Sequence, residues 1–522
     1  MQELENNEKQ IADSNSPKRP NAFLRALGFD AEAKGTSIRT ELVAGVVTFL
    51  AMAYILTVNP NQIFGEGSSY WASAFIATAL SAVIGTLLMA FVAKMPLAQA
   101  SGMGLNSMLG GIIGGWGGYG AAFTPGQAFM LVFISGLVFM ALSFIKIKGK
   151  SFRELVFDGM PVSVRSAISV GIGLFIAYIG FQNAGIIIAN EYTQVGFVDF
   201  TNWGEQVVNL GTPTIEAAKT AAVALSGVLV IAILDKINVK GSIILGILFA
   251  SIVGIPLGVT DLSILAGNGA VSWRFWENFT EYFSMNEDKS VFGSFVNVFT
   301  EGLTPDGISV FTTIMIVVTM CMIDMFDTMG TIVGCCSGSP VLSDENGKPR
   351  NYGRIMISDS VATCTGAMLG TATVTTFVES GAGVSAGGRT GLTAFTTASL
   401  FFASMFALPL FAAIPGAAAA SALIYVGVLM MKSNIKGIDV SDTINATSAF
   451  LTISVMVLSY SITKGIGVGM ISYALMTLID YLVALIRSAI TGKEKPEWRI
   501  SVVTIIVAAL FCIYFFVPAT AF

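Results

Sequence analysis

Residues 371–391, TATVTTFVESGAGVSAGGRTG, interrupt a part of the chain that is otherwise strongly apolar. The stretch begins with β-branched and aromatic residues at 373–377, which favour an extended strand over a helix. A polar residue, Ser380, then stands where it could cap a glycine-rich half-helix. A segment that changes from strand to helix inside an apolar region is typical of the short, broken spans that form transporter binding sites.

Residues 95–118, MPLAQASGMGLNSMLGGIIGGWGG, repeat this pattern, with Asn106 as the candidate cap. Non-helical backbone is tolerated at membrane depth only where it is buried in protein or lines a wet cavity. Two half-helices that begin near the midplane would direct their positive N-terminal ends at a shared point. We therefore expect Gly104 and Gly381 to lie near a polar ligand, whereas the glycines of 110–118 also fit close helix packing.

The composition of the chain points to a membrane protein. Of its 522 residues, 54% are hydrophobic and 12% charged, and the mean hydropathy is +0.75. Soluble proteins carry about 25% charged residues, so we expect an integral membrane protein with many spans in the lipid bilayer. The net charge of -5, without a basic patch, excludes nucleic acid as a partner. The lack of histidine and of zinc-like cysteine spacing argues against a metal or other cofactor.

Apolar segments of about 17–25 residues recur along the chain. The first set covers 43–58, 72–93, 97–115, 127–147, 167–189, 216–234 and 241–258. The second set covers 308–335, 355–373, 376–390, 391–413, 416–431, 446–462 and 465–486. A last run, 501–518, is either a further span or a helix at the interface.

The distribution of lysine and arginine fixes the direction of these segments. These residues precede the first span and follow the even-numbered ones, so the positive-inside rule places the N-terminus in the cytoplasm. An odd number of spans in the first half gives the second half the opposite orientation, which makes the halves inverted repeats. The predicted fold is an all-α integral membrane protein of about 14 transmembrane segments, two inverted repeats of seven, with segments 3 and 10 short and interrupted.

This reading divides the chain into five parts. They are a cytosolic N-terminal tail at 1–41, a first inverted repeat at 42–258, an acidic and aromatic extracytoplasmic loop at 259–307, a second inverted repeat at 308–487, and a C-terminal segment at 488–522 with a further apolar helix.

Residues 322–334, MIDMFDTMGTIVG, carry two aspartates inside an apolar run. A helix would place four polar residues on one face: Asp324, Asp327, Thr328 and Thr331. Glu379 supplies a third intramembrane carboxylate from segment 10. An acidic residue at the centre of a membrane helix costs roughly 2.5–3.5 kcal/mol, so three cost on the order of 8–10 kcal/mol. A cost of this size indicates a functional role.

The partners of these carboxylates follow by exclusion. Arg354 and Arg389 lie near span ends, and no lysine or arginine shares the acidic face. A proton, a metal cation or the N–H groups of a substrate remain. Because two aspartates at i and i+3 repel each other, one of them is expected to hold a proton. We assign proton coupling to Asp324, Asp327 and Glu379, although a protonated Asp324 could also bond to a neighbouring helix.

The other polar residues indicate the kind of substrate. Carboxylates from two helices, with Asn106, Ser380 and Thr331 beside them, offer mainly hydrogen-bond acceptors and a few donors. Phe377 could stack on a flat ring. This set fits a small planar ligand with several N–H groups, such as a nucleobase, and does not fit an anion.

Four motifs give the chain a family resemblance. They are GVVTFLAMAYILTVNP at 45–60, GMGLN at 102–106, MFDTMGT at 325–331, and TTFVES with the AGV and GGRTGLTA that follow it at 375–394. With these motifs the chain resembles the nucleobase/ascorbate transporter (nucleobase:cation symporter) family. Within that family it is most similar to the AzgA-like branch of adenine, guanine and hypoxanthine permeases.

The resemblance implies an architecture and a set of site residues. Segments 1–4 and 8–11 would form a core domain and segments 5–7 and 12–14 a gate domain, in a homodimer that works by an elevator-type movement. The carboxylate of segment 8 falls on Asp327 and a later polar position on Thr331. The glutamate of segment 10 falls on Glu379, the aromatic residue before it on Phe377, and the polar position of segment 3 on Asn106.

The resemblance also implies an activity. Aspartate replaces the glutamate that the uracil-type members carry in segment 8, and the neighbouring histidine is absent, so purine transport is favoured over pyrimidine transport. The resemblance further implies proton symport, with sodium as the alternative ion, in the plasma (inner) membrane.

Three other readings fit the sequence less well. An intramembrane aspartyl protease needs its two aspartates on different helices, whereas Asp324 and Asp327 share one helix; we therefore expect no enzyme. An anion carrier of the related sulfate-permease type would have a positive site. A channel would conduct without saturation.

Overall fold

The computed structural model describes residues 29–115, 122–147, 150–151, 159–190, 193–207, 215–266, 272–286, 288–305, 308, 310–336, 339, 341–343, 349–491, 497–498 and 500–516. Within these ranges the chain is mainly helical, as predicted, and its strands are short. Most of the predicted tail, residues 1–28, the glycine-rich end of segment 3 at 116–118 and the chain end at 517–522 lie outside the described residues.

The helices of the first half follow the predicted order. They are α3 (Ile38–Met52) with α4 (Ile55–Phe64), α5 (Trp71–Leu88), α6 (Met103–Ile113), α7 (Pro125–Phe144), α9 (Val162–Asn183), α10 (Ala217–Lys236) and α11 (Ser242–Gly254). Helix α3 begins upstream of the predicted boundary at residue 42, because the side chain of Ser37 accepts a bond from Thr40 N and caps it.

The second half repeats this order. Its helices are α14 (Val310–Cys336), α15 (Tyr352–Leu369), α16 (Ser380–Ser385), α17 (Gly391–Ser404) with α18 (Leu408–Ala412), α19 (Gly416–Asn434), α20 (Thr443–Leu458) and α21 (Ile462–Thr491), and α22 (Val502–Phe516) follows them. In the described ranges, nine helical stretches are long and apolar enough to cross a membrane, and five further apolar helices are shorter. The number of fourteen crossings stays a prediction.

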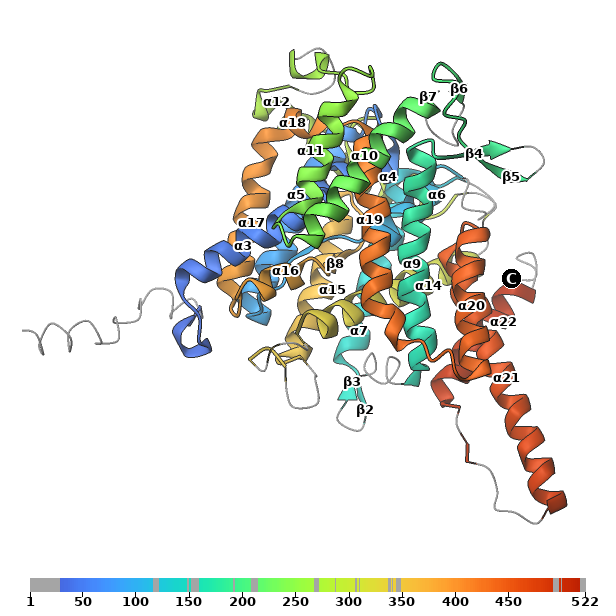
Figure 1. Ribbon diagram of the computed structural model, residues 1–522. Coiled ribbons are helices and arrows are strands. Elements are labelled where there is room, and N and C mark those ends of the chain that lie inside the picture. Colours follow the sequence, from blue (N-terminus) through green and yellow to red (C-terminus); the bar gives the residue numbers. More distant parts are fainter. Residues whose placement is uncertain are drawn as a thin grey trace, which may run out of the picture.

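Short β-hairpins lie at the two ends of the molecule. The hairpins β4 (Ile187–Asn190) with β5 (Gln194–Phe197) and β6 (Gln206–Val207) with β7 (Ile215–Glu216) lie at the upper end in Figure 1, and β2 (Lys146–Ile147) with β3 (Lys150–Ser151) lies at the lower end. Single turns of tighter or wider helix are η1 (Glu32–Lys34), η2 (Met89–Ala93), η3 (Ser263–Ala266), η4 (Met405–Ala407) and η5 (Ile435–Gly437).

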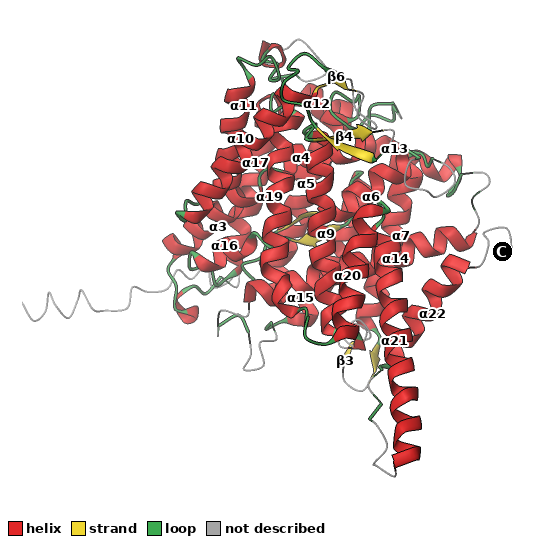
Figure 2. Cartoon of the chain, turned by 45° about the vertical axis from the view of Figure 1, so that its right-hand side comes forward, coloured by secondary structure: helices red, strands yellow, loops and turns green. Residues whose placement is uncertain are grey.

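The strands β1 (Gln99–Ser101) and β8 (Val374–Thr376) pair antiparallel at mid-height of the molecule (Figure 2). Their register sets Gln99 opposite Thr376, Ala100 opposite Thr375 and Ser101 opposite Val374. Each strand runs into a half-helix, α6 or α16. The prediction of an extended stretch at 373–377 is therefore confirmed. The pairing satisfies the backbone groups of both broken segments inside the protein, as the membrane setting requires.

The half-helices α6 and α16 begin without a side-chain cap. The prediction that Asn106 and Ser380 cap them is therefore wrong. The side chain of Asn106 is buried within α6 and accepts a bond from Ser101 Oγ at 2.7 Å. The hydroxyl of Ser380 accepts a bond from Ala98 N at 3.0 Å. Both side chains bond to the opposite or preceding strand segment, which stabilises the strand crossing.

We divide the helices into two groups, which we name the core group and the gate group after the division that the resemblance implies. The core group comprises α3 to α7 and α14 to α18, and within it α15 packs on α5 and α7 while α17 packs on α3 and α5. The gate group comprises α9 to α11 and α19 to α21, in which α9 packs on α19 and α20. The two groups meet where α4 contacts α19 and where α6 and α14 contact α9.

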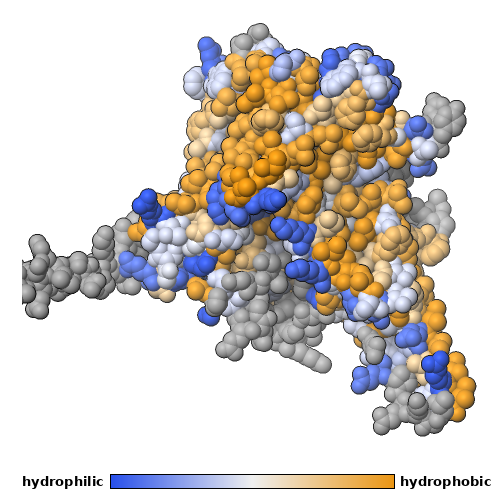
Figure 3. Space-filling view, viewed as in Figure 1, coloured by the Kyte–Doolittle hydropathy of each residue, from blue (hydrophilic) through white to orange (hydrophobic). Residues whose placement is uncertain are grey.

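The outer flank of the molecule is apolar. Figure 3 shows a broad hydrophobic surface over the side that carries α10 and α11, and hydrophilic residues lie at the upper end and in the lower part. Large exposed side chains on this flank include Leu229, Ile233, Leu248 and Ile252. Apolar surface of this extent on helices of membrane-spanning length is what contact with lipid requires.

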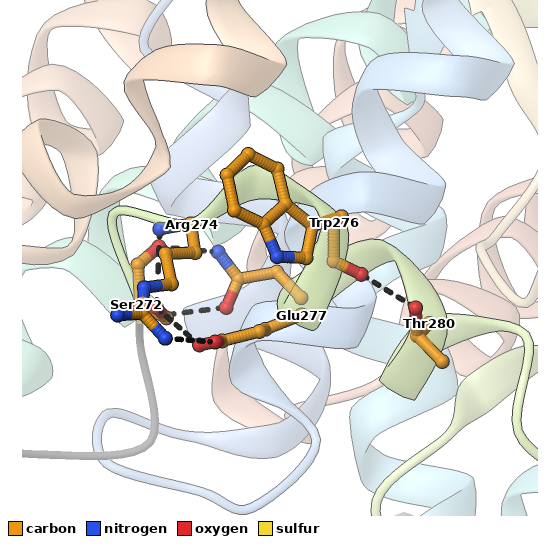
Figure 4. Close-up of polar contacts among 6 residues, drawn as sticks. Ser272, Arg274, Trp276, Glu277 and Thr280 are labelled. Carbon is orange, nitrogen blue, oxygen red and sulfur yellow. Dashed lines mark hydrogen bonds and ion pairs between the residues drawn. The ribbon is translucent and has the colours of Figure 1, made fainter.

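The loop predicted at 259–307 forms two helices, α12 (Phe275–Tyr282) and α13 (Val291–Glu301). Figure 4 shows the start of α12, where Ser272 Oγ and Arg274 Nη1 donate to the Glu277 carboxylate at 2.7 and 3.1 Å. These bonds, led by the one from Ser272, hold the pKa of Glu277 below its usual value. Trp276 is 66% exposed on this helix, a position typical of tryptophan at a membrane–water interface.

The packing of α9 against α19 depends on facing glycines. A Cβ on Gly427 would lie 2.6 Å from Gly173 O and 2.7 Å from Ala177 Cβ, so no larger side chain fits between the helices. We expect Gly427→Val to separate them and to lower the free energy of unfolding by about 1–3 kcal/mol. Thermal unfolding of the purified protein in detergent measures this change. A Cβ on Gly353 meets nothing within 4 Å, so Gly353→Ala is the control. Equal melting temperatures for the two variants would contradict this packing.

Candidate functional site

A cavity of about 250 Å³ lies between the core group and the gate group. The core group contributes Met103, Gly104, Asp327, Thr331, Thr376, Phe377, Val378 and Glu379. The gate group contributes Ser169, Ile172, Ile176, Val426, Met430, Ser433 and Asn434. The carboxylates thus come from the core side, while the gate side is mainly apolar until the C-terminal end of α19. We call this space the central cavity.

Glu379 is the best-defined polar group of the central cavity. It stands directly before α16 and is 6% exposed. Its Oε1 accepts a hydrogen bond of 2.6 Å from the hydroxyl of Tyr54, which lies at the break between α3 and α4. Its Oε2 is buried and has no hydrogen-bond partner among the described residues. A buried acceptor without a partner costs about 1–3 kcal/mol. This oxygen can therefore accept a hydrogen bond from a ligand or bind a proton.

Asp327 lines the same cavity from α14. Its side chain is partly exposed, and its Oδ2 accepts a long hydrogen bond of 3.4 Å from Thr375 Oγ1 on β8. Thr331 lies one helical turn further along α14 and also lines the cavity. None of the ion pairs between described residues includes Asp327 or Glu379. Two carboxylates therefore face one space, and no basic side chain is among the described residues that line it.

The acidic face of α14 divides between two neighbours. Asp324, buried at 1% exposure, accepts a bond of 3.0 Å from Thr363 Oγ1 on α15. Thr328 Oγ1 donates in turn to Asp359 Oδ1 on α15 at 2.9 Å. The four residues that the sequence placed on one face span about 100° of the helix. One edge, with Asp327 and Thr331, reaches the cavity, and the other edge packs against α15.

Asp359 is a fourth intramembrane carboxylate, which the sequence analysis missed. It is fully buried, and its Oδ1 also accepts a bond of 2.9 Å from Gln99 Nε2 on β1. Asp359 and Thr363 stand at i and i+4, as do Asp324 and Thr328, and the two pairs bond reciprocally across antiparallel helices. Recognising this repeated D-x-x-x-T spacing in segments 8 and 9 could have identified Asp359.

The structure brings together five of the eight predicted site residues. Asp327, Glu379, Phe377, Gly104 and Thr331 all line the central cavity. The three others, Asn106, Ser380 and Asp324, are buried behind it and do not line it. The side-chain nitrogen of Asn106 has no hydrogen-bond partner among the described residues.

Sequence reasoning missed Tyr54 and every residue on the gate side. Tyr54 belongs to the quoted motif at 45–60, but a tyrosine in an apolar run gives no sign of a partner 325 residues away. Ile172 and Val426 look like ordinary membrane-facing residues in sequence. Ser433 and Asn434, at the polar end of α19, and Ser169 on α9 are the gate residues whose polar type could have indicated a site.

This arrangement can hold a small planar molecule. Glu379 Oε2 and Asp327 accept N–H groups from two directions, and either carboxylate can instead hold a proton. Phe377 offers a ring, and Ile172, with its neighbours on the gate side, offers an apolar wall. An anion would meet two carboxylates in a space of low polarity, which is strongly unfavourable.

Comparison with known proteins gives both sequence and structural relatives. A family model described as "Permease family" matches residues 39–468. The adenine permease AdeP of Escherichia coli is 33% identical over 86% of this chain and 89% of its own length. The guanine/hypoxanthine permease PbuO of Bacillus subtilis is 33% identical over 94% of this chain and 100% of its own length.

Solved structures share the fold at low sequence identity. The transmembrane domain of the cyanobacterium bicarbonate transporter BicA superposes with a TM-score of 0.55 at 15% identity, over 82% of this chain and 97% of that one. The murine anion transporter Slc26a9 in its inward-facing state gives 0.54 at 13% identity, over 90% and 75%. The predicted fold of two inverted repeats is the fold of these membrane transporters.

The reciprocal contacts between α14 and α15 generate a stability prediction. Asp359→Leu would remove the acceptor of Thr328 Oγ1 and the shorter of the two bonds of Gln99 Nε2, which would keep a bond of 3.4 Å to Thr376 Oγ1. Loss of a buried partner costs about 1–3 kcal/mol. We expect a clearly lower melting temperature in detergent and a smaller loss for Asp359→Asn, which keeps an acceptor oxygen. Asp261→Leu, at an exposed aspartate, is the control. If Asp359→Leu melts with the control, the reciprocal contacts do not stabilise the core group.

Proposed function

The chain belongs to the Permease family, and from this premise we propose that it imports purine nucleobases together with protons by an elevator-type alternating-access mechanism. Its relatives at 33% identity are named adenine and guanine/hypoxanthine permeases, and they align over nearly their whole length. The observation that carries the proposal is the buried Oε2 of Glu379, an acceptor without a described partner at a cavity that also holds Asp327.

A purine base matches the central cavity in its chemistry. Its N–H groups can donate to Glu379 Oε2 and to Asp327, and its ring can lie against Phe377. Tyr54 holds Glu379 Oε1 at 2.6 Å, so the orientation of the carboxylate is fixed before the base arrives. This preorganisation reduces the entropy that binding must overcome.

The free-energy cost of burying two negative charges in one cavity supports proton coupling. With the cavity empty, a proton on one carboxylate relieves both the repulsion between them and the burial of charge. A bound base also stabilises the carboxylates, because its N–H groups donate hydrogen bonds to them. We infer that a proton and a base enter together because either one alone leaves a charged carboxylate without compensation. Sodium is the alternative ion.

The division of the cavity supports movement of one group against the other. The acidic residues lie on the core group, and the apolar residues Ile172, Ile176 and Val426 lie on the gate group. A core group that slides along an apolar gate face would carry the base and its partners as one unit. The central cavity extends to Asn434, beside Lys432 and Lys436, which the positive-inside rule places in the cytoplasm. We therefore propose that this state is inward-facing. We also propose that the N-terminus lies on the cytoplasmic side of the plasma membrane and that the working form is a homodimer.

Glu379→Gln tests the assignment of the site. The amide keeps the shape of the side chain but turns one acceptor into a donor, and loss of a charged hydrogen bond costs about 1.5–3 kcal/mol. We expect purine uptake to fall by about 10- to 100-fold at unchanged expression, measured with radiolabelled adenine, guanine and hypoxanthine in cells deficient in purine uptake. Glu281→Gln, at an exposed glutamate, is the matched control. Normal uptake by Glu379→Gln would refute the assignment.

The coupling ion is tested in proteoliposomes. We expect an inward proton gradient to drive purine accumulation above equilibrium and a protonophore to abolish it, because a carboxylate of the central cavity carries the proton. Sodium-free buffer should leave accumulation unchanged. Accumulation that follows a sodium gradient and ignores the protonophore would assign the coupling to sodium. An excess of bicarbonate or sulfate, which the site should reject, is the control for substrate class.

A further inference from the structure

A second cavity of about 250 Å³ lies at the other end of the contact between core and gate groups. It is bounded by the end of α4 and by the N-terminal half of α19, from Gly416 to Leu423. The central cavity contacts the same helix from Val426 to Asn434. The midpoints of these two stretches of α19 are about ten residues, roughly 15 Å, apart. We call the second space the outer cavity, because topology places this end of α19 outside.

Gln62 distinguishes the outer cavity from a packing defect. This residue lines the cavity from α4 and is 9% exposed. Neither its Nε2 nor its Oε1 has a hydrogen-bond partner among the described residues. A buried amide without partners is unfavourable, because it loses the hydrogen bonds that water would give it. The chain would lose nothing by placing leucine here unless the amide meets something that the cavity admits.

Three further polar residues line the outer cavity, namely Asn61, Glu66 and, from α9, Asn183. Asn61 accepts a bond of 2.5 Å from Trp71 Nε1 at its Oδ1, which leaves its NH2 group as a donor. Glu66 accepts a bond of 3.0 Å from Gly416 N through Oε2, which leaves Oε1 as an acceptor. Val58, Ile215 and Leu423 are among the apolar residues of the lining. The outer cavity therefore combines a planar amide, a carboxylate and apolar surface, as the central cavity combines carboxylates, a ring and apolar surface.

We propose that the outer cavity is a second binding site for a planar heterocyclic base, an inference that rests on the proposed function. An amide such as that of Gln62 presents a donor and an acceptor side by side, and it can pair with the donor and acceptor edge of a purine. Glu66 Oε1 can accept a further N–H group. One wall belongs to the core group and the other to the gate group, so the site exists only while these two surfaces are in their present relation.

The site would act before the central cavity during import. A base held at Gln62 is concentrated at the outer end of the contact between the groups, and movement of the core group opens this contact. The site is therefore expected to affect the apparent affinity for uptake more than the maximal rate.

Photolabelling locates bound base directly. We would incubate membranes that contain the full chain with an azidopurine, irradiate them and map adducts by peptide mass spectrometry. We expect adducts both in residues 374–380 and in residues 58–66. Gln62→Leu should reduce the second adduct by about tenfold, which corresponds to about 1.4 kcal/mol, and leave the first unchanged. Glu379→Gln should do the reverse.

A second variant tests the outer cavity without a change at Gln62. A Cβ on Gly416 would lie 2.3 Å from Glu66 Oε2, so Gly416→Ala must displace this carboxylate. We expect the same selective loss of the outer adduct, with Gly353→Ala as the unaffected control. An adduct confined to residues 374–380 in the unmodified protein would show that only water occupies the outer cavity and would overturn the second site alone. Adducts at neither stretch would overturn the proposed function together with it.

Discussion

The antiparallel pairing of β1 with β8 is the contact on which the rest of the site depends. Broken helices leave backbone N–H and C=O groups without partners, and lipid offers none. The two broken segments supply each other's partners, with Phe377 N donating to Ala98 O at 3.0 Å and Gly102 N donating to Thr373 O at 2.9 Å. This crossing fixes where α6 and α16 begin, and therefore where Glu379 and Gly104 face the central cavity.

Side chains next to the crossing place the acids of α14 and α15. Gln99 on β1 donates to Asp359, and Thr375 on β8 donates to Asp327. Asp359 is fully buried and accepts two bonds at Oδ1, whereas Asp327 accepts one long bond and is partly exposed. The acids thus fall into two classes. Asp324 and Asp359 accept bonds between α14, α15 and β1 behind the cavity, where they hold the core group together. Asp327 and Glu379 line the central cavity, where they are available to a ligand or a proton.

The sequence contains the parts of this arrangement that depend on residue type. Acidic residues in apolar runs indicated Asp327 and Glu379, and β-branched residues at 373–377 indicated the strand. The parts that depend on direction could not be read in this way. The polar face of α14 is wide enough that Asp324 and Asp327 contact different neighbours. Asn106 bonds to Ser101 in the strand crossing and not to the first turn of α6. Tyr54 and the gate residues acquire a role only through contacts distant in sequence.

The central claim is that the carboxylates of Asp327 and Glu379, which line the central cavity, bind the transported base. The most direct measurement is an experimental structure of the protein with a purine bound, at a resolution that places the base and its hydrogen-bond partners. The account predicts a base in the central cavity with an N–H group within hydrogen-bond distance of Glu379 Oε2 and its ring against Phe377. A base bound away from both carboxylates, or a basic side chain seated on Glu379 in their place, would contradict it.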